Sequence, residues 1–133
     1  MIAGLIYTPN LTIECIGEKM KECDELTDGG FWLIDAKTKD LYMSDKFLSA
    51  FGYDRCDFLK PNFDTLFEFV IKKDLDIGIK DLEYVLKTKS QETFMNDIRY
   101  NCKNGTIQKV SCSGTVFFIK DEPVLILGTH KLI

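Results

Sequence analysis

The chain contains little of what most catalytic, metal-binding and membrane-spanning proteins need. Its 133 residues include one histidine, one tryptophan and three prolines, and no His or Cys cluster has metal-ligand spacing. The longest apolar runs, such as Val116–Ile119 and Val124–Leu127, are too short to cross a bilayer. Lys and Arg total 17 against 21 Asp and Glu, and this balance argues against the clustered positive charge that nucleic acid or an anionic membrane requires.

The composition indicates one folded domain in a reducing compartment. Hydrophobic residues make up 45% of the chain and aromatic residues 12%, which suffices for a modest core. The five cysteines are odd in number and lack the spacing of a disulfide scaffold. The start of the chain, Met1–Tyr7, lacks a basic stretch, and its apolar run is too short for a signal peptide. We therefore expect a cytoplasmic protein, with neither nucleic acid nor a membrane as partner.

Residues 1–28 are expected to form a strand-like start followed by an amphipathic helix. Thr8-Pro9 is typical of a helix start, and Gly29-Gly30 marks its end. One apolar stripe follows the helix at spacings of three and four residues: Ile13, Ile16, Met20 and Cys23. Either this stripe lies across the chain's own sheet or it pairs with the same helix of a second chain. Both readings stay open at this point.

Residues 29–133 begin with two predicted strands and a short helix. Residues 31–34 and 41–44 are the strands, joined by a polar turn. Ser44 or Asp45 is expected to cap a helix that ends at Gly52. Irregular helical turns are expected over residues 54–73, which Pro61 interrupts.

A longer helix and a three-stranded meander complete the domain. Asp74 is predicted to be the N-cap of a helix that reaches about Lys87. Residues 92–102, 106–119 and 124–132 are predicted strands. At Asn104-Gly105, a three-residue loop would pair Ile98 with Val110, and a two-residue loop would pair Ile98 with Ser111. We favour the first register because it pairs apolar with apolar.

Five segments, in order and spacing, resemble a PAS domain over residues 29–133. They are Trp32-Leu-Ile-Asp35, Ser44 to Tyr53 ending in Gly-Tyr, Asp74 before the long helix, Arg99 with Asn104-Gly105, and Gly128-Thr129-His130. The resemblance implies an α+β fold: a five-stranded antiparallel sheet with helices on one face, here with an added N-terminal helix. It also implies a non-catalytic sensory and protein-interaction module of signal transduction. We expect it to form a homodimer and to act on an output domain or partner of the histidine kinase, cyclase or transcription regulator class.

A ligand pocket is expected where the sheet faces the helices. The large apolar and aromatic side chains predicted to line it are Trp32, Phe47, Phe51, Phe67, Ile79, Leu82, Phe94, Ile98, Tyr100, Phe118, Leu125 and Leu127. Asn96, Arg99, Tyr100 and Ser113 are the polar groups expected to orient a ligand there. For any one apolar residue, however, a place in a filled core is the more common role.

Neither flavin nor His-ligated haem is expected, although an unidentified small ligand is. Cys56-Asp-Phe-Leu59 is similar to the flavin-bonding motif of light-oxygen-voltage domains, but it follows Gly-Tyr too closely. The predicted long helix has no histidine to ligate haem, and thiolate ligation by Cys102 or Cys112 stays chemically open. His130 is expected at the surface. The alternative function is a small cone-shaped α+β enzyme, isomerase-like or dehydratase-like, acting on a small apolar molecule, but no catalytic residues are predicted.

Overall fold

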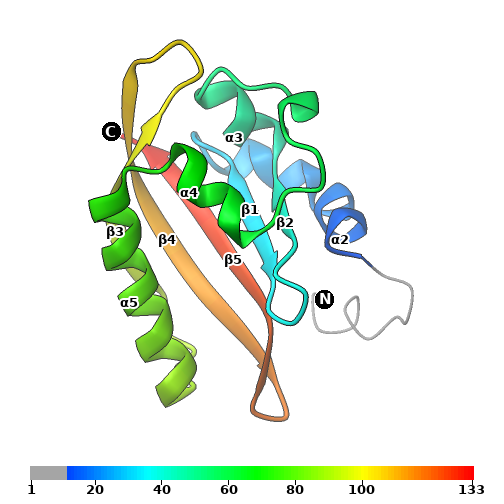
Figure 1. Cartoon of the computed structure of the whole chain (residues 1–133). Coiled ribbons are helices and arrows are strands. Elements are labelled where there is room, and N and C mark those ends of the chain that lie inside the picture. The colour runs from blue at the N-terminus through cyan, green and yellow to red at the C-terminus, as the bar shows by residue number, and fades with distance from the viewer. Residues whose placement is uncertain (1–11) are drawn as a thin grey trace.

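A five-stranded antiparallel sheet forms the centre of the molecule (Figure 1). The structure is a computed structural model that describes residues 12–133. The strands lie in the order β2-β1-β5-β4-β3, so the first and last strands of the domain are neighbours at its middle. Their bounds are β1 Phe31–Asp35, β2 Leu41–Met43, β3 Phe94–Asn101, β4 Ile107–Ile119 and β5 Glu122–Leu132.

Helices cover both faces of this sheet, with the larger group on one face. That group consists of α3 (Asp45–Ala50), the 3₁₀ turns η2 (Arg55–Asp57) and η3 (Phe63–Thr65), α4 (Leu66–Phe69) and α5 (Lys72–Thr88). The opposite face carries α2 (Ile13–Lys19), followed by the 3₁₀ segment η1 (Lys21–Leu26). The predicted α+β class is therefore confirmed. The main group of helices lies on one face of the sheet, and the additional N-terminal helix lies on the other.

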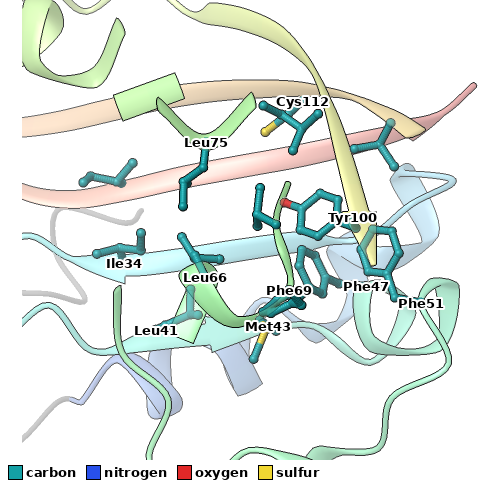
Figure 2. Close-up of a cluster of buried hydrophobic side chains, with 14 of the residues drawn as sticks. Ile34, Leu41, Met43, Phe47, Phe51, Leu66, Phe69, Leu75, Tyr100 and Cys112 are labelled. Carbon is teal, nitrogen blue, oxygen red and sulfur yellow. The ribbon is translucent and has the colours of Figure 1, made fainter. Parts of the chain in front are cut away.

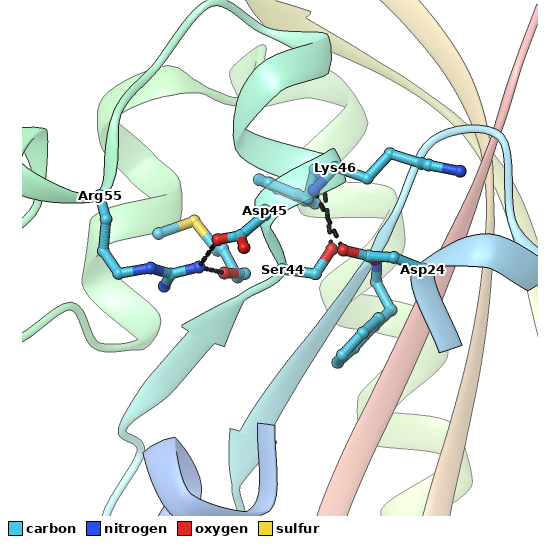
Figure 3. Close-up of polar contacts among 8 residues, drawn as sticks. Asp24, Ser44, Asp45, Lys46 and Arg55 are labelled. Carbon is cyan, nitrogen blue, oxygen red and sulfur yellow. Dashed lines mark hydrogen bonds and ion pairs between the residues drawn. The ribbon is translucent and has the colours of Figure 1, made fainter. Parts of the chain in front are cut away.

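Ser44 joins the two sheet strands to the start of α3. Its hydroxyl oxygen accepts hydrogen bonds from the backbone N–H of Phe31 at 2.9 Å and of Phe47 at 3.3 Å. The second bond is an N-cap, so of the two predicted capping residues it is Ser44 that caps the helix. Figure 3 shows Asp24 of η1 beside it, where the carboxylate accepts from Lys46 N at 3.1 Å. The N-terminal segment is thereby tied to α3.

The β3–β4 hairpin has the register that the sequence favours. Ile98 pairs with Val110 and Tyr100 with Gln108. Gly105 has φ +91°, which a residue without Cβ adopts readily, and its N–H donates to the Cys102 carbonyl at 2.9 Å. The three-residue loop is confirmed.

The N-terminal helix lies on the chain's own sheet. The predicted start at Thr8-Pro9 lies outside the described residues, and α2 begins at Ile13, with Thr12 as N-cap. Ile13 and Ile16 are buried against β1 and β2, while Met20 and Cys23 are partly buried there. Within residues 12–133, no helix combines the length and the apolar character that crossing a membrane requires.

A glycine sets how closely α2 approaches the sheet. A Cβ built on Gly17 would overlap the ring of Tyr42 on β2. The helix backbone therefore rests directly on an aromatic face, which only glycine permits at this distance.

The predicted N-cap role of Asp74 is wrong. The N-cap position of α5 is Ile71, three residues earlier, which provides no side-chain cap, and the helix begins at Lys72. Asp74 thus lies in the first turn, and its carboxylate accepts hydrogen bonds from Arg99 on β3 instead of from its own helix.

Candidate functional site

An apolar cavity lies between the sheet and the helices α4 and α5. Its volume is about 70 Å³. The sheet contributes Trp32, Ile34, Phe94, Asn96, Ile98, Tyr100 and Cys112, and the helical layer contributes Phe63, Leu66, Val70, Leu75, Gly78, Ile79 and Leu82. Most of these belong to the main hydrophobic core, part of which Figure 2 shows. The cavity is therefore a space within the core, of the kind that binds small molecules.

Two aromatic rings cover two glycines on the sheet side of this cavity. Trp32, Gly128, Gly114 and Phe94 are successive partners in one row across four strands. A Cβ on Gly128 would overlap the Trp32 ring, and one on Gly114 would overlap the Phe94 ring. The Trp32 ring thus lies over β5 from the β1 side, and the Phe94 ring lies over β4 from the β3 side. The glycines leave room for the rings because they have no side chain.

Tyr100 and His130 form a buried polar pair next to the cavity. The Tyr100 hydroxyl and His130 Nε2 are 3.1 Å apart. His130 is 1% exposed, and its ring stacks on Phe47 at a centroid distance of 4.9 Å. Burial lowers the pKa of His130 to about 3 and raises the pKa of Tyr100 well above its usual value. Both side chains are therefore uncharged at neutral pH.

The prediction that His130 lies at the surface is consequently wrong. Its place on β5 points the side chain inward, in line with Ile126 and Gly128. The backbone of His130 also bonds the residues before β1: it donates to Gly30 O at 3.0 Å and accepts from Gly29 N at 3.1 Å. The histidine thus connects the core to the segment that leads from η1 into the sheet.

Two more polar groups reach the cavity wall. The Asn96 amide nitrogen donates to Asp81 on α5 at 2.7 Å, which ties β3 to the helix. Cys112 is buried, and desolvation raises the pKa of its thiol to about 12, against a smaller lowering effect of a hydrogen bond with Trp32. The thiol is therefore protonated at neutral pH and is not a reactive thiolate.

Half of the apolar residues predicted for the pocket do line the cavity. They are Trp32, Ile79, Leu82, Phe94, Ile98 and Tyr100. Phe47 and Phe51 are buried in the adjoining core, where Phe51 stacks on Tyr100 at 4.3 Å, and Phe118 packs at the margin of the same cluster. These three side chains belong to the core next to the cavity and do not border it.

Five predicted positions lie elsewhere. Phe67 is 50% exposed and contacts Phe63 on the outside of the helical layer. Leu125 and Leu127 face α2 on the opposite side of the sheet, because their neighbour Ile126 takes the inward position. Arg99 and Ser113 alternate with inward residues in the same way and do not line the cavity.

Sequence reasoning missed part of the helical wall and the buried histidine. Leu66 and Val70 lie in the segment predicted to form irregular helical turns, and their inward direction depends on short turns without a clear period. The inward direction of His130 follows from strand alternation once Gly128 is placed inside.

Neither a cluster of metal ligands nor the exposed cysteine forms part of the site in the part of the chain that the structure describes. Among the described residues, no group of three or more His, Cys, Asp or Glu side chains is arranged to hold a metal ion. Cys56 lies in η2, is exposed, and does not border the cavity.

Comparison with known proteins identifies the fold and the family. The family model described as PAS fold matches residues 40–130. The chain belongs to this PAS-fold family. The match covers the short helix, α5, the meander and all of the residues that line the cavity except Trp32 and Ile34 on β1. No curated protein matches the chain.

Solved structures with the same fold include a sensory box histidine kinase/response regulator, a PAS domain of an HTR-like protein and a light-oxygen-voltage domain. A sensory box histidine kinase/response regulator from Burkholderia thailandensis has a TM-score of 0.67 and 17% identity, covering 86% of this chain and 84% of its own. The PAS domain of an HTR-like protein from Haloarcula marismortui has a TM-score of 0.61 and 19% identity, covering 91% and 94%. A light-oxygen-voltage domain studied with a flavin analogue has a TM-score of 0.64 and 18% identity, covering 87% and 84%. At these identities the likeness shows the fold of this PAS domain alone.

Proposed function

We propose that this PAS domain is a cytoplasmic sensory and protein-interaction module without catalytic activity, which binds a small molecule in its core. The observation that carries this proposal is the apolar cavity between the sheet and α5, bordered by a buried tyrosine that retains a polar group. An apolar cavity with few polar groups is the common form of a small-molecule site.

A continuous set of contacts connects this cavity to the N-terminal segment. Tyr100 contacts His130, and His130 stacks on Phe47 of α3. At the start of α3, the backbone N–H of Lys46 donates to the Asp24 carboxylate of η1. A ligand that moves Tyr100 would change the packing of α3 and thereby the position of η1. We propose that this change is transmitted to an output domain or a partner protein of the histidine kinase, cyclase or transcription regulator class.

The cavity argues against a flavin or haem cofactor. At about 70 Å³ the cavity is smaller than an engineered cavity of ~150 Å³ that binds benzene, and flavin and haem are both far larger than benzene. The one histidine of the chain is hydrogen-bonded to Tyr100, and Cys56 is exposed in η2, away from the cavity. Cys112 lies at the cavity wall, but its raised pKa disfavours the thiolate that haem ligation needs.

The arrangement also favours a binding module over an enzyme. The buried histidine lies in a stack of aromatic rings rather than in a wet cleft, and its low pKa removes it from acid–base chemistry near neutral pH. Asp74, the buried carboxylate, is paired with Arg99. PAS sensory domains are generally non-catalytic, and this site supports the same role.

A homodimer remains part of the proposal, with a different surface from the one first expected. Ile13 and Ile16 are buried against the chain's own sheet, so they do not form the dimer contact that the sequence suggested. Leu26 at the end of η1 and Met95 on β3 are exposed and border one groove on the α2 side. We propose that a second copy contacts this side.

Native mass spectrometry of freshly purified protein tests ligand and assembly together. The expected result is a dimer that carries added mass from a small molecule. Gly78→Val serves as the matched control, because its side chain enters the cavity from α5, where the nearest atom to an added Cβ is 4.0 Å away. Loss of the added mass in this variant supports the cavity as the site. An apo mass for the wild-type chain under every gentle condition, with no binding of added small molecules, would contradict the ligand-binding part.

A further inference from the structure

We propose that the cavity binds a small uncharged molecule that is apolar apart from one hydrogen-bond acceptor oxygen, and that the Tyr100 hydroxyl donates to this oxygen. This inference rests on the proposed ligand-binding function and adds the chemical class of the ligand.

The wall of the cavity selects against charge. Its lining holds no Lys, Arg, His, Asp or Glu side chain among the described residues. A charged ligand would lose its hydration without gaining a counter-charge, which is unfavourable. The amide nitrogen of Asn96 already donates a hydrogen bond to Asp81, so it is less available to a ligand than the nitrogen of a solvated amide. An uncharged, mostly apolar molecule fits this wall.

The volume limits the size of the ligand. The cavity of about 70 Å³ has about half the volume of an engineered cavity of ~150 Å³ that binds benzene. By that proportion, the ligand has roughly three or four non-hydrogen atoms in the conformation described.

The surroundings of His130 determine which atom donates between it and Tyr100. His130 Nδ1 is buried and has no hydrogen-bond partner in the part of the chain that the structure describes. Whichever ring nitrogen carries the proton, one buried donor lacks an acceptor among the described residues: the Nδ1–H of His130 in one tautomer, and the Tyr100 O–H in the other. Only the Tyr100 hydroxyl borders the cavity, so only that donor can be satisfied by a ligand, and with a ligand bound the proton belongs on Nε2, with Nε2–H donating to the Tyr100 oxygen.

This direction leaves the hydroxyl proton of Tyr100 free. The hydroxyl has no second hydrogen bond with any described residue. Figure 2 shows it directed away from Phe51 and toward the side of the cluster that holds Leu66 and Leu75, two residues of the cavity wall. A buried donor without an acceptor is unfavourable, and a ligand oxygen in the cavity satisfies it.

Gly78 supplies an independent sign that the space is maintained. It lies in the interior of the 17-residue helix α5, where glycine disfavours the helix relative to alanine. No positive φ requires glycine there, and the nearest atom to an added Cβ is Ile98 Cδ1 at 4.0 Å. The fold would accommodate a methyl group at this position, and its absence keeps the cavity larger.

The histidine tautomer provides the first test. Because the chain has one histidine, a long-range proton–nitrogen NMR spectrum of labelled protein reports His130 without ambiguity. With propan-2-one added as a small ligand that carries an acceptor oxygen, we expect the Nε2–H tautomer near neutral pH. A proton on Nδ1 in that complex would mean that Tyr100 donates to His130, and the proposal would be wrong.

A matched series of probes provides the second test. Propan-2-one, 2-methylpropene and acetate each have a trigonal centre with three substituents, and they differ in carrying a neutral oxygen, no oxygen or a charge. Titrations followed by backbone amide NMR shifts at the cavity residues should rank propan-2-one first and acetate last. Tyr100→Phe should weaken propan-2-one by about three- to tenfold and leave 2-methylpropene unchanged. Gly78→Val should weaken both.

The outcomes separate this proposal from the function on which it rests. If 2-methylpropene binds as tightly as propan-2-one, or Tyr100→Phe weakens both equally, the acceptor oxygen is refuted and the ligand-binding function stands. If acetate binds best, the uncharged class is refuted. If none of the probes shifts a cavity resonance in the wild-type chain, while native mass spectrometry detects no bound molecule, the ligand-binding function falls as well.

Discussion

Asp74 in the first turn of α5 accepts three hydrogen bonds from Arg99 on β3. One comes from the Arg99 backbone N–H at 2.8 Å, and two come from the guanidinium at 2.8 and 2.9 Å. The Asp74 side chain is 11% exposed and that of Arg99 43%. The pair therefore fastens the long helix to the edge strand of the sheet, on the helix that borders the cavity.

Removing the Asp74 carboxylate should destabilise the domain. We expect Asp74→Ala to lower the free energy of unfolding by about 1–3 kcal/mol, because a partly buried guanidinium and a backbone N–H lose their acceptor. Asp74→Asn should cost less, since its amide oxygen still accepts one bond. Urea melts measure both changes, and Lys72→Ala, which removes an exposed ion pair with Asp76, is the control with little effect.

The same pair should make the domain acid-labile. The hydrogen bonds from Arg99 lower the pKa of Asp74, so the folded state binds its proton less readily than the unfolded chain does. Its stabilising effect is full above the unfolded pKa of about 3.9 and is lost as pH falls through the folded value. Asp74→Asn should remove this part of the acid response, and an unchanged response below pH 4 would contradict it.

His130 should produce a separate pH dependence at milder acidity. Its pKa falls from about 6.5 in an unfolded chain to about 3 in the folded state, so the unfolded chain binds more protons between these values. The free energy of unfolding should therefore fall by about 1.4 kcal/mol per pH unit as pH drops from 6 towards 3. Melts at several pH values measure the slope. His130→Gln should flatten it between pH 6 and 4.5, where carboxylates contribute less.

Alanine should have opposite effects at two glycines that both lie in helices. At Gly78 on α5 we expect Gly→Ala to raise stability by about 0.5–1 kcal/mol, because helix propensity improves and a methyl group has room. At Gly17 on α2 we expect the same change to lower stability by about 1–3 kcal/mol, because the methyl overlaps Tyr42 and the helix must move off the sheet. Urea melts compare the two variants. Equal signs would contradict the close contact of α2 with β2.

Purified protein should show no visible-range cofactor absorption. We expect neither a flavin band at about 450 nm nor a Soret band at about 400 nm, since such bands belong to the cofactor itself. An absorption spectrum of freshly purified protein measures this directly, and either band would overturn the cofactor part of the proposal. Adding flavin mononucleotide and then removing the excess is the control, because it detects a site that was merely empty.

Those parts of the fold were predictable that depend on residues close together in the sequence. Asn104-Gly105 marked the hairpin, and the preference for pairing Ile98 with Val110 favoured the three-residue loop over the two-residue loop. Ser44 or Asp45 before a short apolar pattern marked the start of α3, and Ser44 is the cap. In each case neighbouring residues supplied all the information, so no distant partner was needed.

The errors arose where a distant partner decided the outcome. Asp74 has the chemistry of an N-cap, but Arg99, which is 25 residues away, takes its carboxylate. Leu125 to Leu127 are apolar at successive positions because both faces of β5 are covered, so alternation could not show which residues point inward. His130 shared that ambiguity. Its polar character suggested the surface, although Tyr100 gives it a partner inside the core.

Trp32 gives the chain a built-in optical probe. It is the only tryptophan, it lies over Gly128, and it borders the cavity together with Cys112. Its fluorescence therefore originates from a single ring in an apolar setting, beside a thiol that can quench the emission. A molecule that enters the cavity displaces that ring or changes its distance from the sulfur atom. Occupancy can thus be followed by emission intensity and wavelength in unlabelled protein, at concentrations far below those that NMR requires.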